Sequence, residues 1–354
     1  MQEKIYKMSG AGNDFVVLDG RGVDVSGFRR PERIAELCRE YRTDGLMILD
    51  NGGADFRMEF FNPDGSGGMM CGNGGRCIVA FADWLGIAPA DGRTYHFLAP
   101  DGLHSAVILA RPSGGCGTTS GGTSFASSTP QIPDLRGPRN SLTTAPPIYD
   151  GPLPLPVSGG GHARQGLSTT ASAAWTVKLK MIDVEGVSEV LGGYFLNTGT
   201  RHFVKFVEDV DAIDVAKEGK ELRWNEAFAP EGANINFVQQ LPDGSLKIRT
   251  FEKGVEGETL ACGTGITAAA LAAWFAGVLP RDTDAGHSDG QCRDRRPLVG
   301  HGTALCPSRL APAGIRLQAR RGDILNVDFI PDGPAKFHDI HLTGPAEFCK
   351  TSEL

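Results

Sequence analysis

The sequence is poor in several features that mark particular classes of protein. Its 354 residues contain no apolar run of about 18 residues, so no segment is expected to cross a membrane. Residues 1–8 lack the apolar stretch of a secretory signal. Positive charge is not in excess, because the formal net charge is −7 at pH 7, which disfavours a nucleic-acid partner. Eight cysteines without a signal favour free thiols in a cytoplasmic protein over a disulfide scaffold.

The composition is that of a globular protein with more than one core. Hydrophobic residues make up 40% and charged residues 22% of the chain, as in ordinary globular domains. A chain of 354 residues is long enough for two domains. The mildly acidic balance is common in enzymes that act on small molecules, so a small-molecule substrate is the expected partner.

Two short segments share one pattern. Residues 71–74 read Cys-Gly-Asn-Gly and residues 262–265 read Cys-Gly-Thr-Gly, and each segment opens an apolar run. Unpaired N–H groups at a helix start, together with the helix dipole, stabilise a thiolate or a bound carboxylate. One cysteine before a helix is more often a small buried apolar residue. The repetition favours two reactive thiols instead, Cys71 and Cys262.

Apolar spacing predicts similar elements in the two parts of the chain. We expect helices over 31–41, from 72 to about 85, near 210–218 and from 263 to about 277, and strands over 45–50, 56–61, 94–99, 105–109, 233–239, 246–251, 315–319 and 324–330. The helices after Cys71 and Cys262 are apolar on almost every side, so each should be buried. The predicted fold class is therefore α/β (α+β), with two pseudo-symmetric halves, each made of strands wrapped around a central buried helix.

Two irregular stretches interrupt this order. Residues 111–175 are dominated by Gly, Pro, Ser and Thr and lack the apolar surface that offsets chain entropy, so we interpret them as a low-complexity insertion. We expect an N-terminal half over 1–110, a C-terminal half over 176–340 with a second irregular stretch at about 281–313, and a tail over 341–354 that returns to the N-terminal half.

The second irregular stretch contains four side chains that can bind zinc. Their spacing lacks the close cysteine pairs of structural zinc sites, so we expect a solvated loop and no metal site. These residues are His287, Cys292, His301 and Cys306.

A pair of thiols can invert a carbon that carries a carboxylate. One face needs a base and the opposite face an acid, and a thiolate and a thiol can exchange these parts. An ordinary cysteine has a pKa of about 8.5, so we expect the helix starts to lower the pKa of one thiol. The same helix ends would stabilise the charge that develops on the substrate, and no cofactor is expected.

Several motifs around these cysteines match one family. They occupy residues 9–15, 61–66 with 70–76, 250–254 with 257–265, and 342–347. On these motifs the chain resembles diaminopimelate epimerase, which interconverts LL- and meso-diaminopimelate on the route to lysine and peptidoglycan. The resemblance covers about residues 4–110, 175–280 and 314–354, and it implies the fold of that family, cofactor-independent epimerase activity and a homodimer.

The resemblance also implies roles for individual residues. Cys71 and Cys262 become the acid and base. The substrate-binding positions are Asn13, Asn62, Gly72, Asn73, Asn234, Glu252, Lys253, Gly263 and Thr264, with His202 and Thr200 in support. The asparagines at 13, 62 and 234 are implied to bind the distal end of the substrate, Glu252 the reacting amino group, and the residues after each cysteine the reacting carboxylate. His202, which is implied to tune the thiols, could equally be a structural histidine.

Two short segments depart from the family pattern. Thr200 and Arg201 stand where Asn-Pro is common, and Lys253 stands where arginine is usual, although lysine cannot form a bidentate clamp on a carboxylate. A related two-cysteine racemase or epimerase acting on proline or hydroxyproline is therefore an open alternative. From another class, the two cysteines could form a switchable disulfide in a thiol redox or binding protein.

Overall fold

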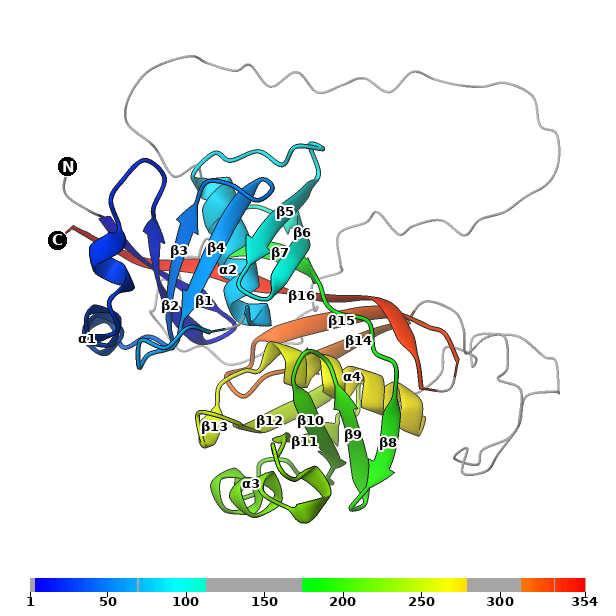
Figure 1. The fold of residues 1–354 in the computed structure, drawn as a ribbon. Helices are drawn as coiled ribbons and strands as arrows, with labels where there is room; N and C mark the ends of the chain where they lie inside the picture. Colours follow the sequence, from blue (N-terminus) through cyan, green and yellow to red (C-terminus); the bar gives the residue numbers. More distant parts are fainter. Residues whose placement is uncertain (1–3, 69, 113–173, 279–312, 334, 354) are drawn as a thin grey trace, which may run out of the picture. The chain divides into compact units, whose positions relative to one another are not determined.

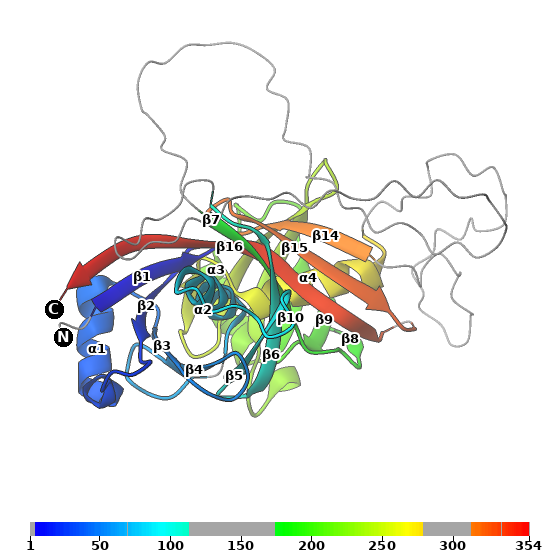
Figure 2. The same cartoon turned by 90° about the horizontal axis from the view of Figure 1, so that it is seen from above.

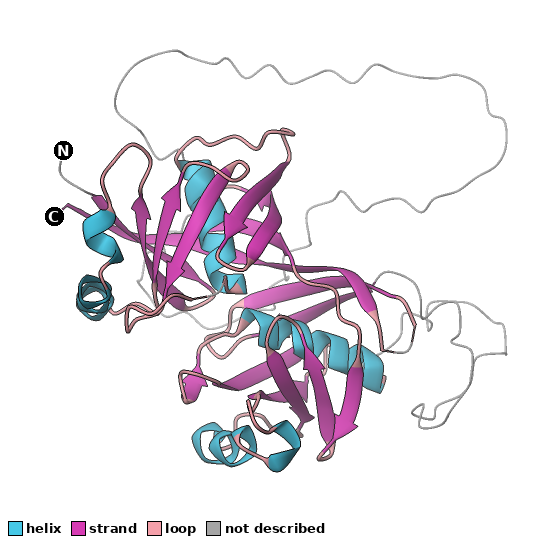
Figure 3. Ribbon diagram, viewed as in Figure 1, coloured by secondary structure: helices cyan, strands magenta, loops and turns pink. Residues whose placement is uncertain are grey.

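The computed structural model describes residues 4–68, 70–112, 174–278, 313–333 and 335–353. Within them, strands β1 to β16 are hydrogen-bonded into one continuous sheet. Two buried helices, α2 (Gly72–Trp84) and α4 (Gly263–Ala276), are each surrounded by strands (Figure 3). None of the helices in these ranges is long and apolar enough to cross a membrane.

The first set of strands closes into a ring around α2. Its members, in hydrogen-bonding order, are β1 (Lys4–Gly10), β2 (Asn13–Asp19), β3 (Leu46–Asp50), β4 (Phe56–Phe61), β5 (Thr94–Ala99), β6 (Gly102–Ala110), β7 (Ala174–Lys180) and β16 (Phe337–Glu353). The ring closes because β16 also pairs with β1. A closed ring leaves no strand edge unpaired, and every residue of α2 from Gly72 to Ala82 is buried inside it.

The second set of strands surrounds α4. It continues from β16 through β15 (Ile324–Pro331), β14 (Ala313–Gln318), β12 (Leu246–Glu252), β11 (Asn234–Gln240), β10 (Arg201–Phe206), β9 (Gly193–Asn197) and β8 (Val187–Val190), and β13 (Gly257–Thr259) pairs with β12. A single bridge from Val184 to Phe337 brings the chain before β8 back to β16. Strand β16 is 17 residues long and runs along both sets (Figures 1 and 2).

Two shorter helices and two 3-10 turns cover the outside of the strands. They are α1 (Pro31–Tyr41), α3 (Val215–Arg223), η1 (Ser26–Arg29) and η2 (Glu226–Phe228). Helix α1 buries Ile34, Leu37 and Cys38 against β2 and β3, as its apolar stripe requires. The aromatic rings of Phe203 and Phe228 pack together under α3, with centroids 5.2 Å apart.

The predicted fold class is confirmed, and most predicted elements lie within a few residues of their expected positions. Helix α1 has the expected bounds, since Pro31 occupies its first turn and Arg42 ends it in the left-handed conformation. The helix expected near 210–218 instead begins at Val215. Asp214 caps that helix by accepting a hydrogen bond from the Lys217 N–H at 3.1 Å, which fixes the start there.

The strands at the junction of the halves differ from expectation. Starting the C-terminal half at residue 176 assigns most of β7 to it, whereas β7 pairs with β6 and β16 in the ring around α2. Strands β8, β9 and β10 were not anticipated by apolar spacing, and the expected tail is the end of the long strand β16. Nearly all of the 111–175 insertion lies outside the described residues, as do His287, Cys292, His301 and Cys306.

Candidate active site

Cys71 caps the first turn of α2. Its backbone is extended, with φ −105° and ψ 152°, and its Sγ accepts a hydrogen bond from the Gly74 N–H at 3.2 Å. Serine, threonine, aspartate and asparagine are the usual residues here, because an acceptor at this position satisfies an otherwise unpaired N–H group. A sulfur in this position faces the positive end of the helix dipole.

Cys262 occupies the equivalent position at the start of α4. It is 8% exposed, while Cys71 is half-buried. Its Sγ lies 3.4 Å from Thr264 Oγ1. Cys71 and Cys262 are both free thiols, so the structure contains no disulfide between them.

The two helix starts meet at a pair of glycines. A Cβ added to Gly263 would lie 3.0 Å from Gly72 Cα and 3.4 Å from the Gly72 backbone nitrogen, and a Cβ on Gly72 would lie 3.3 Å from Gly263 Cα. Any side chain at either position would push the helices apart. The cysteines immediately before these glycines are therefore held on either side of one contact, and Cys71 raises the pKa of Cys262 through its charge.

Asn73 ties the two halves together beside this contact. Its Nδ2 donates to the Ala261 carbonyl, immediately before Cys262, at 3.1 Å, and also to Asn13 Oδ1. The Nδ2 of Asn13 donates in turn to the Asp44 carboxylate at 3.2 Å. Both ends of the Asn13 amide are thus hydrogen-bonded. Asp44, in the loop before β3, and Asn73 of α2 fix its orientation.

A second network reaches Cys262 through Thr264. The Thr264 hydroxyl lies 3.0 Å from His202 Nε2, and the Thr200 hydroxyl lies 2.8 Å from the same nitrogen. On the other side of the ring, Asn236 Nδ2 lies 3.2 Å from His202 Nδ1. Because an amide NH₂ only donates, Nδ1 must be the acceptor, and the ring proton is on Nε2.

Burial keeps His202 neutral. The side chain is fully buried, and desolvation lowers its pKa to about 3. His202 therefore influences Cys262 as a hydrogen-bonding group that orients Thr264, since its charge does not change near neutral pH.

Two carboxylates from different halves lie near one another, and one of them, Glu252, acts on the thiols. Burial raises the pKa of Glu252, and the neighbouring Asp44 adds to the rise. Glu252 also raises the pKa of Cys71 and of Cys262 through its charge. Burial likewise raises the pKa of Asp44. This side of the site is acidic, which suits a positively charged amino group.

The remaining expected positions lie at varied distances from this centre. Asn234 belongs to the His202 network, because its Nδ2 lies 3.3 Å from Thr200 Oγ1 and its Oδ1 accepts from the Lys253 N–H at 2.8 Å. The Lys253 side chain is exposed. Asn62 is held within its own loop, where its Nδ2 donates to Ser66 Oγ at 3.0 Å. Within the described part of the chain, the side-chain hydrogen bonds of Asn62 stay in this loop and do not reach the other expected positions.

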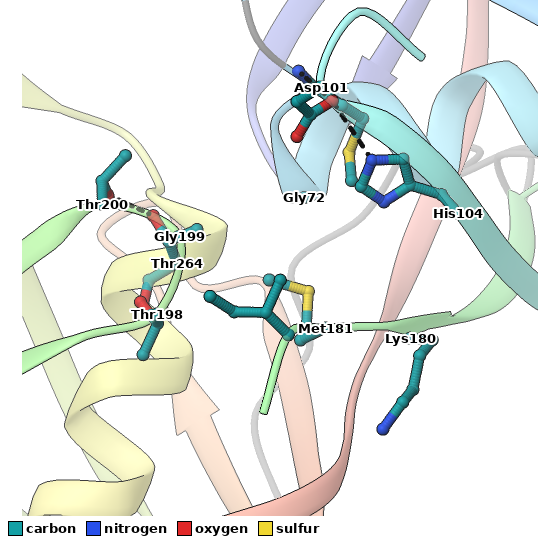
Figure 4. A pocket seen from close by; sticks show the side chains of 11 residues that line it. Gly72, Asp101, His104, Lys180, Met181, Thr198, Gly199, Thr200 and Thr264 are labelled. Atoms are coloured by element: carbon teal, nitrogen blue, oxygen red, sulfur yellow. Dashed lines mark hydrogen bonds and ion pairs between the residues drawn. The ribbon is translucent and has the colours of Figure 1, made fainter. Parts of the chain in front are cut away.

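A pocket borders the two helix starts (Figure 4). Thr264 and Thr200 lie on one side of it, and Asp101 and His104 lie on the other. His104 Nε2 is 3.1 Å from Asp101 Oδ1. The pocket reaches Gly72 of α2 as well, although the two sulfurs do not line it. The lining residues are Met70, Gly72, Asp101, His104, Lys180, Met181, Ile182, Thr198, Gly199, Thr200 and Thr264.

Desolvation is the main influence on the pKa of both thiols. It raises the pKa of Cys71 to about 11 against the opposing Gly74 N–H, and it raises the pKa of Cys262 as well, with Glu252 adding to the effect. The helix-start N–H groups do lower the pKa of each thiol, as expected, but the net shift is upward. Loss of water around the sulfur outweighs the helix N–H groups.

Three residues of the site were missed by sequence reasoning. Asn236 follows Asn234 by two positions on β11, so the period of a strand places both on one face, a signal that was available. Arg76 lies within a motif that was used only for recognition. Asp44 carries no local signal, because it lies in the loop before β3 and its contact with Asn13 of β2 spans 31 positions of sequence.

Comparison with known proteins gives one consistent family. A family model for diaminopimelate epimerase matches residues 5–101 and 194–293. Diaminopimelate epimerase from Aquifex aeolicus (strain VF5) is 32% identical over 290 residues, which cover 78% of this chain and 84% of that protein. The corresponding protein of Chlorobaculum tepidum (strain ATCC 49652 / DSM 12025 / NBRC 103806 / TLS) is 35% identical over 271 residues, covering 75% of this chain and 80% of the relative.

Solved structures share the fold at low sequence identity. A phenazine biosynthesis protein of the PhzF family from Bacillus anthracis superposes with a TM-score of 0.59 over 100% of this chain and 99% of its own, at 11% identity. At that identity the likeness concerns the fold alone.

Proposed function

This chain belongs to the diaminopimelate epimerase family, and we propose that it epimerises diaminopimelate by proton transfer between Cys71 and Cys262 on opposite faces of the α-carbon. The observation that carries the proposal is the meeting of two cysteine-capped helix starts at Gly72 and Gly263. An isomerase of this kind needs two acid/base groups that flank one carbon, and the glycine contact supports that placement.

Charge at the site supports a substrate that carries both an ammonium and a carboxylate group. The N-terminal ends of α2 and α4 converge at the glycine contact, so a carboxylate beside it faces the positive ends of two helix dipoles. Glu252 and Asp44 supply negative charge for an amino group. These are the two groups attached to the reacting carbon of an amino acid.

The proton transfer balances between the two sulfurs. One cysteine, as thiolate, removes the α-hydrogen, and the electron pair of the C–H bond stays on the α-carbon. The thiol of the other cysteine gives its proton to the opposite face of that carbon. The stereocentre is then inverted, and the two sulfurs have exchanged protonation states. The helix ends stabilise the charge that develops toward the carboxylate in the transition state.

Recognition of the distal end rests on less specific contacts. Thr200, which stands where the family pattern commonly has asparagine, turns its hydroxyl toward His202 and Thr264. Lys253 offers a single ammonium group in place of a planar guanidinium. We therefore propose diaminopimelate as the substrate with a weaker hold on its distal carboxylate than an arginine would give.

Deuterium exchange at the α-carbon tests the assignment. The protein is incubated in D₂O under reducing conditions with LL-diaminopimelate and, separately, with L-proline, and α-deuteration is followed by NMR. We expect exchange with diaminopimelate and none with proline. Cys71→Ser and Cys262→Ser should each reduce the rate by about 10³-fold or more, because general acid–base catalysis contributes on this scale.

The matched control for these variants is Cys349→Ser, which changes a free and exposed cysteine of β16. It should exchange at the wild-type rate. Exchange with proline alone would overturn the substrate, and retained exchange in either active-site variant would overturn the two-base assignment. Absence of exchange with both substrates would favour the thiol redox or binding protein.

We also propose that the enzyme acts as a homodimer in the cytoplasm, where its thiols stay reduced. Light scattering of the full chain tests the dimer, and a monomeric mass at micromolar concentration contradicts it.

A further inference from the structure

Arg76 is an arginine buried completely in the first turns of α2. It is 0% exposed, and its three hydrogen-bond partners are all neutral. Nη1 donates to the Gly72 carbonyl at 3.0 Å, Nη2 donates to Asn73 Oδ1 at 2.9 Å, and Nε donates to the Pro345 carbonyl of β16 at 3.4 Å. The absence of a side chain at Gly344 makes room for Nε, since a Cβ there would lie 3.2 Å from it.

A buried guanidinium normally has an anionic partner. Moving an isolated charge out of water is costly unless it is paired, and arginine does not lose its proton in proteins. Among the described residues, no carboxylate lies within ion-pairing distance of Arg76, although the ion pairs of the other arginines are numerous. The charge of Arg76 is therefore unexplained by the structural framework.

Three groups act on Arg76 through their charge. They are the thiols of Cys77 and Cys71 and the carboxylate of Asp323. Asp323 is already paired with Arg321 at 3.1 Å. Cys77 is fully buried in the apolar core, and desolvation raises its pKa far above the ordinary value, so it stays a neutral thiol. Cys71 is the group of the three that is half-buried at a helix start and can become an anion.

The equivalent position in the helix of the other half carries no charge. Arg76 follows Cys71 by five positions, and the residue five positions after Cys262 is Thr267. Thr267 makes the same local contact, because its hydroxyl donates to the Gly263 carbonyl at 3.0 Å as Arg76 donates to Gly72. The two helices thus have matching hydrogen bonds but differ by one positive charge.

We propose that Arg76 is the built-in counter-charge of Cys71, so that Cys71 is the first of the two cysteines to ionise and Cys262 holds the proton in the free enzyme. Arg76 does not touch the substrate on this view and is a positioning residue, because it acts through Cys71 and through the oriented amide of Asn73. The difference in charge between the two helices does not depend on the proposed function. Only its use in catalysis rests on the proposed two-thiol proton transfer.

The other groups near the thiols act on both of them. Glu252 raises the pKa of both sulfurs through its charge. The Gly74 N–H favours an anion at Cys71, whereas the hydroxyl of Thr264 and the Gly265 N–H do so at Cys262. The guanidinium of Arg76 is the one full positive charge among these influences, and it favours Cys71.

The test is a titration that does not depend on turnover or on access to reagents. Full-length protein labelled with ¹³C at the cysteine Cβ is titrated by NMR from about pH 7 to 11, with assignments from Cys71→Ser and Cys262→Ser. Ionisation of a thiol shifts its Cβ resonance, and the pH at which that shift begins is compared between the two cysteines. We expect Cys71 to begin to titrate at least about one pH unit below Cys262, a tenfold difference in thiolate population.

Two substitutions of Arg76 separate its charge from its shape. Arg76→Met removes the charge with a similar chain length and should raise the Cys71 titration by about one pH unit, while Cys262 moves much less. Arg76→Lys keeps the charge and should leave Cys71 close to its wild-type value. Thr267→Val is the matched control in the other helix, and it should leave Cys71 unmoved although it also removes a side-chain bond to a first-turn carbonyl.

The wild-type order of titration decides the proposal even where Arg76→Met does not fold. Titration of Cys262 before Cys71, or of both together, overturns it, and so does an unshifted Cys71 in a folded Arg76→Met protein. These results are independent of the proposed function. If the protein exchanges deuterium but Cys262 ionises first, the proposed function stands and the role of Arg76 is refuted. If Cys71 ionises first but no deuterium is exchanged, the role of Arg76 stands and the proposed function is refuted.

Discussion

The contact between Gly72 and Gly263 can be tested by adding one methyl group. In Gly263→Ala the new Cβ would lie 3.0 Å from Gly72 Cα and 3.1 Å from a methyl carbon of Leu342. Carbon atoms prefer separations of about 3.5–4.0 Å, so the helix starts must move apart by a few tenths of an ångström. The first of these neighbours is backbone and cannot move aside as a side chain could.

The stabilising effects of Gly263→Ala are smaller than the cost of its close contacts. Alanine is favoured over glycine in a helix by at most about 1 kcal/mol, including the lower entropy of the unfolded chain. Overpacking of a close-packed interior costs about 1–3 kcal/mol. We therefore expect a net loss of stability of about 1–2 kcal/mol, so the variant should remain folded.

The effect on catalysis should exceed the effect on stability. Displacing the helix starts separates the two thiols from one another and from the reacting carbon, and a misplacement of about 1 Å can cost about 10²-fold in rate. The assay is kcat/KM for α-deuteration of diaminopimelate, measured beside the thermal unfolding midpoint. Gly186→Ala is the matched control, since a Cβ on Gly186 would meet no atom within 4 Å. A Gly263→Ala protein with wild-type rate and stability would refute the reasoning.

Three further results are expected. The log of kcat/KM should rise with slope near one as pH increases from 7 toward 9, because the base must be a thiolate and burial raises the pKa of Cys71 to about 11; a plateau at neutral pH would contradict this. The wild type should lose a few kcal/mol of unfolding free energy between about pH 6.5 and 4, because His202 has a folded-state pKa of about 3 but binds a proton below about pH 6.5 when unfolded. His202→Gln should lose less over the same range. Urea titrations at several pH values measure the unfolding free energy, and an equal dependence on pH in both proteins would count against a neutral His202. Asp44→Asn should raise KM for diaminopimelate about tenfold with a smaller change in kcat, because it removes one charge facing the amino group and loosens Asn13; an unchanged KM would show that Asp44 plays no part in binding.

The sequence by itself determined many of the local elements and the positions of the two cysteines at helix starts. Helix α1 could be bounded from Pro31 and an apolar stripe, because helix starts and periodicity are properties of neighbouring residues. The repeated cysteine and glycine pattern located the starts of α2 and α4, and the family motifs identified the epimerase. These signals lie within about a dozen residues, where the geometry of one turn or one strand limits what the chain can do.

Tertiary structure alone decided which of these elements meet and how the site is charged. Strand β16 joins the two sets of strands, and one of its carbonyls, at Pro345, binds Arg76 across 269 positions of sequence. The raised pKa values of the thiols and the neutral state of His202 follow from removal of water by residues distant in the chain. Local patterns carry no record of such burial, because desolvation and long-range pairing arise only when separate segments pack against one another.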